Sequence, residues 1–314
     1  MPTNLHLSRR QALLGAAALP LAASLAALAR PALAKAAKLG PTVSLVNRFT
    51  LGEFEVAAIL AGNQTAPNPH KLFGLNVSDA DFQAAADAAF IPADKMQFYF
   101  TPTLVNTGAE LVLFDTGIDS AGLTAAMAAA GVTPDQVDVV VLTHMHPDHI
   151  GGLVTNGAPT FANARYVTGG VEHNFWSGAA NELFDANVKP LNDRITFLDD
   201  GGTVAPGITA KMAVGHTPGH MVYMLDSGGK QLVITADTAN HYVWSLAHPD
   251  WEFAYDADKA NAAAARKAVF GMLAADKLPF IGYHMPFPAL GYVEANDSGF
   301  RYVPASYQMM LSAG

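Results

Sequence analysis

The sequence predicts an α/β (α+β) fold in which helices cover β-sheets. Apolar segments of strand length precede helical patterns in both halves of the chain, as expected for helices packed on sheets. Three of the predicted strands end at histidines or an aspartate. No short repeat and no low-complexity linker interrupts residues 35–314, which favours one domain made of two similar halves.

The first predicted elements are β-strands. Residues 47–61 alternate as an extended pair that turns around Gly52. Residues 96–105 and 111–114 are typical of a hairpin, with its turn at residues 106–108. These segments predict a sheet near the start of the domain.

A helix and a buried strand follow. Residues 120–130 form an Ala-rich helical pattern that Gly131 ends, and residues 137–142 are a continuous apolar run of strand length. A polar cluster begins at Thr143, where this strand ends. Residues 165–192 lack a clear period, so we expect helix and loop near the site there.

The second half of the chain shows the same pattern. Strands are predicted at residues 208–214, 221–225 and 231–235, with a turn at residues 226–230. The longest helical pattern, residues 258–275, is followed by a short strand at residues 278–283. Polar residues again fall where the strands end.

Composition limits the function. With 51% hydrophobic and 14% charged residues, the chain is too apolar for disorder. A net charge of −9 opposes binding to nucleic acid. The absence of cysteine excludes disulfides, a thiolate nucleophile and cysteine-ligated metal. Histidine and carboxylate chemistry remains.

Residues 1–34 resemble a twin-arginine signal peptide. Arg9 and Arg10 precede the apolar stretch 12–29, and residues 32–34 form an Ala-Leu-Ala cleavage site. The resemblance implies a periplasmic or secreted protein whose processed chain has no membrane span. The alternative is an uncleaved, membrane-anchoring helix.

The strongest feature is the cluster after the buried strand. Three imidazoles and one carboxylate occur within six residues, at His144, His146, Asp148 and His149. These groups are ligands for a borderline divalent ion such as zinc. His144 and His146 can reach one ion, while Asp148 and His149 turn toward a second. We therefore predict a site for two metal ions.

This cluster resembles the H-x-H-x-D-H motif of the metallo-β-lactamase-fold hydrolases. Residues 115–117, 215–220, 236–237 and 283–284 resemble the other motifs of that family. Residues 283–288 and 299–304 most resemble its methyl parathion hydrolase branch, which includes lactonases and arylesterases. The resemblance implies a four-layer αββα sandwich with the site along one edge.

The resemblance also implies a ligand set. The first ion would be held by His144, His146 and His216, and the second by Asp148, His149 and His284, with Asp237 and a hydroxide bridging the two. Asp148 and Asp237 are then the catalytic carboxylates. We expect zinc, although manganese, iron, cobalt and nickel also accept such ligands.

Other residues are predicted around these ligands. Asp115 and His220 are expected to orient the ligands from behind. Aromatic side chains and one histidine close to the ligand-bearing segments are predicted to line the substrate pocket. These pocket candidates are Trp176, Phe184, His241, Tyr242, Trp244 and Phe287.

The predicted function is that of an exported dinuclear metallohydrolase. The bridging hydroxide would attack an activated ester, either a lactone or an aryl ester. Hydrolysis of organophosphate triesters is the first alternative, and a non-catalytic periplasmic protein that binds metal or ligand is the second. The expected partners are a small-molecule ester and a second copy of the chain, with no nucleic acid.

Overall fold

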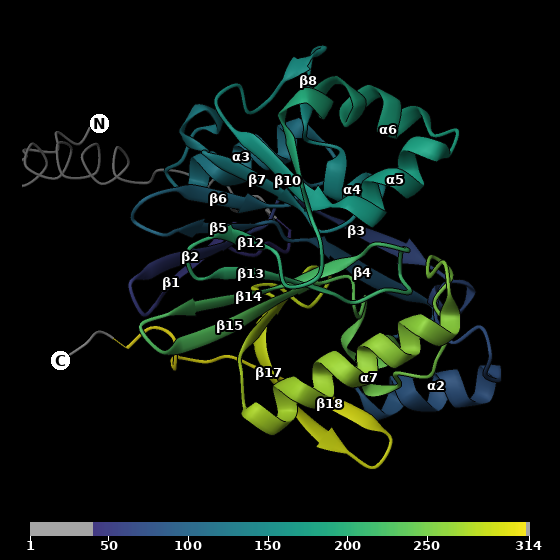
Figure 1. The fold of residues 1–314 in the computed structure, drawn as a ribbon. Coiled ribbons are helices and arrows are strands. Elements are labelled where there is room, and N and C mark those ends of the chain that lie inside the picture. Colours follow the sequence, from purple (N-terminus) through teal and green to yellow (C-terminus); the bar gives the residue numbers. More distant parts are fainter. Residues whose placement is uncertain (1–39, 312–314) are drawn as a thin grey trace, which may run out of the picture. The chain divides into compact units, whose positions relative to one another are not determined.

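A computed structural model describes residues 40–311 of the chain (Figure 1). The elements below belong to one compact unit that begins at Val43. The predicted signal peptide, residues 1–34, lies outside the described residues. Within residues 40–311, no helix has the length and apolar character needed to cross a membrane.

The first sheet has seven strands in the order β1-β2-β5-β6-β7-β10-β11. The pairs from β1 to β6 are antiparallel, whereas β6, β7, β10 and β11 run parallel. The strands are β1 (Val46–Leu51), β2 (Phe54–Ile59), β5 (Thr103–Asn106), β6 (Leu111–Phe114), β7 (Val139–Leu142), β10 (Arg165–Gly169) and β11 (Ile195–Leu198).

The second sheet also has seven strands, in their order along the chain. All neighbouring pairs are antiparallel except β15 and β16, which run parallel. The strands are β12 (Thr203–Ala205), β13 (Ile208–Met212), β14 (Met221–Ser227), β15 (Lys230–Ala236), β16 (Phe280–Gly282), β17 (Leu290–Asn296) and β18 (Gly299–Pro304). Two small two-stranded sheets stand apart, β3 (Gly62–Pro67) with β4 (Lys95–Phe100) and β8 (Val154–Thr155) with β9 (Ala158–Pro159).

Helices cover the outer faces of the two sheets (Figure 1). Side-chain oxygens of Ser78, Asp119 and Asp258 cap the N-termini of α2, α3 and α7, which fixes where these helices begin. The α-helices are α2 (Asp79–Ala88), α3 (Ser120–Ala129), α4 (Pro147–Ile150), α5 (Gly170–Gly178), α6 (Glu182–Asn187) and α7 (Lys259–Asp276). Shorter helical turns are η1 (Pro69–Lys71), η2 (Pro134–Gln136), η3 (Lys189–Arg194) and the π-helical η4 (Tyr242–Ala247).

The core shows how the layers stack. One cluster of buried side chains joins the facing sides of the sheets, for example Phe114 of β6 and Tyr223 of β14, whose rings are 5.2 Å apart. A second cluster joins the other side of the first sheet to α3 and α6, and α7 packs on the second sheet. The predicted α/β fold with an αββα order of layers is confirmed.

The structure corrects two of the sequence predictions. Residues 96–105 are not one strand, because the chain leaves the two-stranded sheet of β3 and β4 and joins the first sheet around Thr101 and Pro102. Proline has no N–H for a continuous ladder, which accounts for the break. Residues 165–192 begin with strand β10 and only then become helical.

Candidate metal centre

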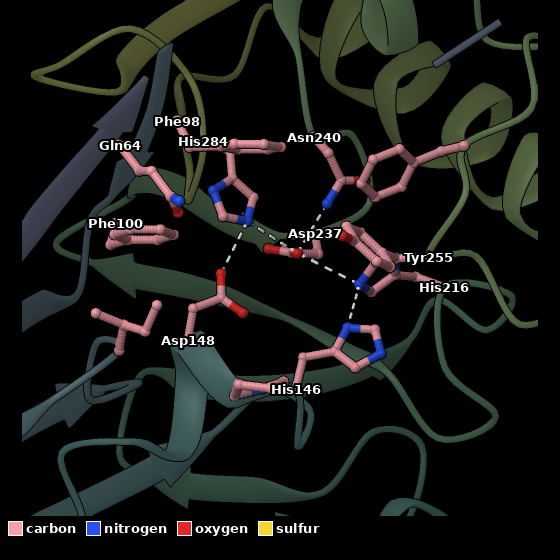
Figure 2. Close-up of a pocket in the computed structure, with 13 residues that line it drawn as sticks. Gln64, Phe98, Phe100, His146, Asp148, His216, Asp237, Asn240, Tyr255 and His284 are labelled. Atoms are coloured by element: carbon pink, nitrogen blue, oxygen red, sulfur yellow. Dashed lines mark hydrogen bonds and ion pairs between the residues drawn. The ribbon is translucent and has the colours of Figure 1, made fainter. Parts of the chain in front are cut away.

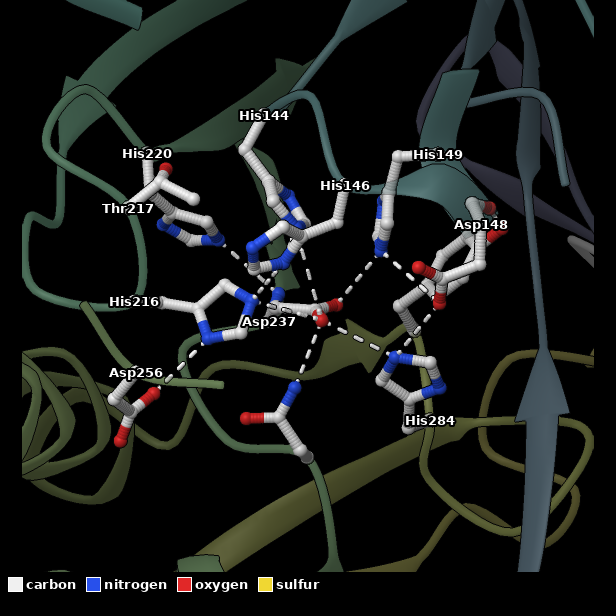
Figure 3. Close-up of polar contacts among 12 residues, drawn as sticks. His144, His146, Asp148, His149, His216, Thr217, His220, Asp237, Asp256 and His284 are labelled. Carbon is white, nitrogen blue, oxygen red and sulfur yellow. Dashed lines mark hydrogen bonds and ion pairs between the residues drawn. The ribbon is translucent and has the colours of Figure 1, made fainter. Parts of the chain in front are cut away.

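The predicted ligands come from four places in the chain and meet at one edge of the sheets (Figure 3). The segment after β7 supplies the cluster His144 to His149, and the segment between β13 and β14 supplies His216. Asp237 follows β15, and His284 lies two residues after β16. Because β15 and β16 are parallel, their carboxyl ends open at the same edge.

Three histidines form the first group of ligand atoms, called here the three-histidine group. His146 Nδ1 lies 3.1 Å from His144 Nε2 and 2.9 Å from His216 Nε2. One ligand atom from each residue falls within 4.8 Å of the others. Imidazole nitrogens that converge in this way suit a divalent ion of the zinc type.

Asp148, His149 and His284 form a second group, called here the mixed group. Asp148 Oδ2 lies 3.3 Å from His284 Nε2 and 3.6 Å from His149 Nε2. A carboxylate and two imidazoles are again ligands for a divalent ion.

Asp237 lies between the two groups. Its Oδ2 atom is 3.3 Å from His216 Nε2 and 3.1 Å from His284 Nε2, and its Oδ1 atom is 3.2 Å from His149 Nε2. One carboxylate therefore faces both groups of ligands, as the resemblance implied for a bridging residue.

Two orphaned atoms show that this arrangement fits cations. Among the described residues, neither His149 Nε2 nor Asp237 Oδ1 makes a hydrogen bond, although both atoms are buried and lie 3.2 Å from each other. A buried polar atom without a partner costs about 1–3 kcal/mol. A bound cation would satisfy both atoms, so the residues present fit divalent metal ions.

The protonation states of His144, His146 and Asp237 suit metal ligands, whereas the carboxylates beside His149, His216 and His284 raise the pKa of those three imidazoles, which would lose their protons on binding a metal ion. Burial lowers the pKa of His146 to about 3 and that of His144 well below its usual range, so both imidazoles are neutral at pH 7. Burial disfavours the charged form of Asp237, but the neighbouring His284 and His149 hold its pKa well below the usual range. Neutral imidazole and ionised carboxylate are the forms that bind metal.

Asp115 and His220 lie behind the ligands, where the sequence analysis placed them. Asp115 Oδ2 accepts a hydrogen bond from His149 Nδ1 at 2.9 Å, and the carboxylate also accepts two from Thr143. His220 Nε2 accepts from the Asp237 backbone N–H at 3.1 Å. The two residues therefore orient a ligand side chain and a ligand backbone, respectively.

The sequence analysis missed a third anchor. Asp256 accepts a hydrogen bond from His216 Nδ1 at 2.9 Å through one carboxylate oxygen and pairs with Arg266 Nη1 at 2.9 Å through the other. Both Asp256 and Arg266 are buried. This contact leaves His216 Nε2 free to face the ligand atoms of the three-histidine group.

A cavity of about 280 Å³ opens onto these groups (Figure 2). Its polar floor includes Asp237, Asp148 and three of the histidines, and Gln64 and Asn240 add neutral polar groups. Asn240 Nδ2 donates to Asp237 Oδ2 at 2.8 Å. The apolar walls are Phe98, Phe100, Ile118, Phe253 and Tyr255. Among the described residues, no lysine or arginine lines this cavity.

None of the six residues predicted to line the substrate pocket lines this cavity. Trp176 packs edge-on against His146, with ring centroids 5.7 Å apart, and its indole N–H donates to Glu172. Phe184 lies on the buried side of α6, where its ring packs into the hydrophobic core against the first sheet. Phe287 is half-buried and lines neither this cavity nor the one described next.

The remaining three pocket candidates line a separate cavity of about 500 Å³. His241, Tyr242 and Trp244 lie there, and His284 borders both cavities. Strand β4 separates the two, because successive side chains of a strand point to opposite faces. Phe98 and Phe100 of β4 face the first cavity, whereas Gln97 and Tyr99 face the second. This alternation is the sequence signal that could have identified the two phenylalanines.

Comparison with known proteins agrees with this geometry. Residues 101–279, more than half of the chain, match the metallo-beta-lactamase superfamily. The chain therefore belongs to that superfamily and is one of its hydrolases.

Particular relatives extend the comparison. AidC, a dizinc quorum-quenching lactonase solved with the product N-hexanoyl-L-homoserine, is 27% identical, with a TM-score of 0.78 over 85% of this chain and 100% of that one. The hydrolase AbOPH of the beta lactamase superfamily is 24% identical, with a TM-score of 0.77 over the same shares, and shows the fold.

One relative matches over a shorter span. A 7,8-dihydropterin-6-methyl-4-(beta-D-ribofuranosyl)-aminobenzene-5'-phosphate synthase from Methanocaldococcus jannaschii is 28% identical over 106 residues. The match covers 31% of this chain and 36% of the synthase, so the chain spans about a third of that relative's length.

Proposed function

We propose that the protein is an exported dinuclear metallohydrolase that opens neutral lactones or aryl esters. The observation that carries this proposal is the cavity itself, where aromatic walls without a cationic side chain open directly onto the two ligand groups. The likeness to a dizinc lactonase over the whole length of that enzyme supports the same class of substrate.

The charge of the cavity selects the substrate class. A phosphate or carboxylate group away from the reacting ester bond is commonly bound by arginine or lysine, which compensate its charge. The lining of the cavity offers neither among the described residues, and its cations would be the metal ions alone. The phenylalanine rings suit an acyl or aryl group, while the ester carbonyl lies at the polar floor.

The chain's own residues then have defined tasks. Divalent ions held by the three-histidine group and the mixed group would lower the pKa of water and polarise the ester carbonyl. Asp237 is ionised beside four histidines. Its free carboxylate could accept the proton that the attacking water loses and pass that proton to the departing alkoxide oxygen, which is a far stronger base. Asn240 fixes the orientation of that carboxylate through its hydrogen bond.

Hydrolysis of organophosphate triesters is the second candidate. A phosphotriester is also neutral, so the same cation-free cavity admits it. A non-catalytic protein that binds metal or ligand is the third candidate, and it differs from the first two only in the absence of turnover.

The experiment is a metal analysis combined with initial rates. The purified protein would be assayed on an aryl ester, a γ-lactone, a δ-lactone, a methyl phosphotriester and a β-lactam, before and after removal of metal by a chelator. We expect about two ions per chain and the highest kcat/KM on a lactone or aryl ester. Fastest turnover of the phosphotriester would favour the second candidate. Two bound ions without turnover of any substrate would favour the third.

Export is tested separately. The double variant Arg9→Lys, Arg10→Lys keeps the charge of the predicted signal but removes its arginine pair. We expect the variant to stay in the cytoplasmic fraction, whereas the parent chain reaches the periplasm or medium. Equal export of both chains would contradict the twin-arginine route.

A further inference from the structure

Glu172 is a buried carboxylate that the mechanism above does not use. It lies in the first turn of α5 and is fully buried. Its carboxylate accepts hydrogen bonds from residues beside the predicted metal ligands and not from the ligands themselves.

One carboxylate oxygen of Glu172 holds the first ligand segment. Glu172 Oε1 accepts from the backbone N–H of Met145 at 3.0 Å and from the indole N–H of Trp176 at 2.6 Å. Met145 stands between His144 and His146, so this bond fixes the backbone that carries two ligands of the three-histidine group.

The other oxygen holds the second ligand segment. Glu172 Oε2 accepts from Thr217 Oγ1 at 2.7 Å and from the Gly219 backbone N–H at 2.9 Å. Thr217 directly follows His216, the third ligand of the group. A single carboxylate therefore joins segments about 70 residues apart in the sequence, as the separation of 70 between His146 and His216 shows.

The packing around Glu172 leaves no room for this contact to shift. A Cβ atom on Gly219 would lie 2.2 Å from the Glu172 backbone nitrogen, so helix α5 and the His216 segment touch at the backbone. An ionised carboxylate offers about four acceptor sites, two on each oxygen. The four donors use all of them, which sets the position of one segment relative to the other.

We propose that Glu172 is a positioning residue that holds the His144–His146 segment and the His216 segment in register, so that the three-histidine group can bind its ion. None of the four hydrogen bonds that its carboxylate accepts comes from a residue of the mixed group. Loss of its acceptor oxygens therefore lowers the affinity of the three-histidine group for its ion and leaves the affinity of the mixed group unchanged. This inference concerns metal binding and holds whichever neutral ester is the substrate.

The test is a titration of metal-free protein with Zn²⁺ and Co²⁺ in competition with a chelator. Glu172→Gln replaces one acceptor oxygen by an amide NH₂, which would face hydrogen-bond donors instead of accepting from them. The matched control, Glu182→Gln, makes the same change at an exposed glutamate on the next helix, α6. We expect Glu172→Gln to lower the affinity for the ion of the three-histidine group by about 10–100-fold. The affinity for the ion of the mixed group should not change. The absorption of the Co²⁺ form should match that of His146→Ala and differ from that of Asp148→Ala.

Two results with Glu172→Gln would overturn the proposal. Unchanged affinity for both ions, or equal weakening of both with a lowered unfolding midpoint of the metal-free protein, would leave Glu172 with a packing role only. Thr217→Val removes one donor and leaves the carboxylate, so it gives the answer if Glu172→Gln does not fold. We expect Thr217→Val to lower the affinity for the ion of the three-histidine group by a few-fold. A lower affinity for the ion of the mixed group alone would contradict the proposal.

Discussion

Buried histidines occur in two neighbouring regions of this protein, and they differ in their partners rather than in their burial. His149 and His284 face carboxylates in the metal centre, whereas His241 in the second cavity faces aromatic rings and two backbone N–H groups. Burial opposes the charged form in both regions. Asp237 and its neighbours nevertheless raise the pKa of His284 to about 10, while burial alone lowers the pKa of His241 to about 3.

This difference shows what identifies a ligand histidine. A buried histidine whose ring nitrogen accepts from the backbone serves the fold, as His241 does when its Nδ1 atom accepts from two N–H groups and caps η4. A histidine that shares a carboxylate with other histidines leaves atoms without partners, as at His149 Nε2 among the described residues. The four predictions below test this distinction, beginning with the largest effect.

The largest effect is expected from Asp237→Ala, which removes the carboxylate that faces both ligand groups. Metal roles contribute several kcal/mol to catalysis, so kcat/KM should fall by roughly 10²–10³-fold with loss of bound metal. Metal content and initial rates measure this effect. Asp276→Ala, an exposed aspartate at the end of α7, is the control. A fully active variant that retains two ions would contradict the assignment of the site.

A smaller effect is expected from Asp256→Asn, which weakens the anchor of His216. Metal affinity should fall by about 10–100-fold, as for other partners behind metal ligands. Arg266 loses its ionised partner, so the free energy of unfolding should fall as well. Chelator competition and urea unfolding measure the two effects, and Asp258→Asn, which keeps a capping side chain on α7, is the control. Unchanged affinity would show that Asp256 serves the fold alone.

The third prediction separates the two cavities. Phe98→Ala removes a wall of the first cavity, while Tyr242→Phe changes a residue of the second. We expect Phe98→Ala to raise KM for the best ester by about tenfold, because lost apolar contact costs roughly 1–3 kcal/mol. Tyr242→Phe should leave KM and kcat unchanged. The reverse result would place the substrate in the second cavity.

The last prediction concerns the pH dependence of stability, which changes little near neutral pH. Since the folded pKa of His241 is about 3, below its ordinary value of 6.5, the unfolded chain takes up a proton that the folded chain does not. Its contribution to stability is present above pH 6.5 and falls by about 1.4 kcal/mol per pH unit on acidification toward the folded pKa. His241→Asn keeps an acceptor for the η4 cap and should lower the slope in urea unfolding of the metal-free protein by the one proton that His241 contributes. The slope due to His144, His146 and His220, whose pKa values burial also lowers, should remain. An equal slope in both chains would contradict the neutral state of His241.

The sequence was most informative where chemistry is local. The residues from His144 to His149 are contiguous, and His216, Asp237 and His284 stand at or near strand ends, so pattern and resemblance could predict a set of residues that the structure brings together. Asp115 and His220 could be predicted for the same reason, since each lies in a motif.

The missed residues depend on contacts between distant segments. Asp256 meets His216 across 40 residues, and Glu172 meets Gly219 across 47 residues, and no local pattern marks either contact. The aromatic residues failed for another reason. Large rings fill core and cavity equally well, so only tertiary packing decides that Phe184 and Trp244 are buried while Phe98 lines the cavity.

The ligand segments are far apart along a chain that contains no cysteine. His146 and His216 are 70 residues apart, and Asp237 and His284 are 47 residues apart. An ion bound by such a pair would act as a cross-link that closes a loop, and a cross-link over loops of this size removes roughly 4 kcal/mol of entropy from the unfolded chain. The ions proposed for catalysis would therefore also cross-link the two halves of the domain, as disulfides do in other proteins.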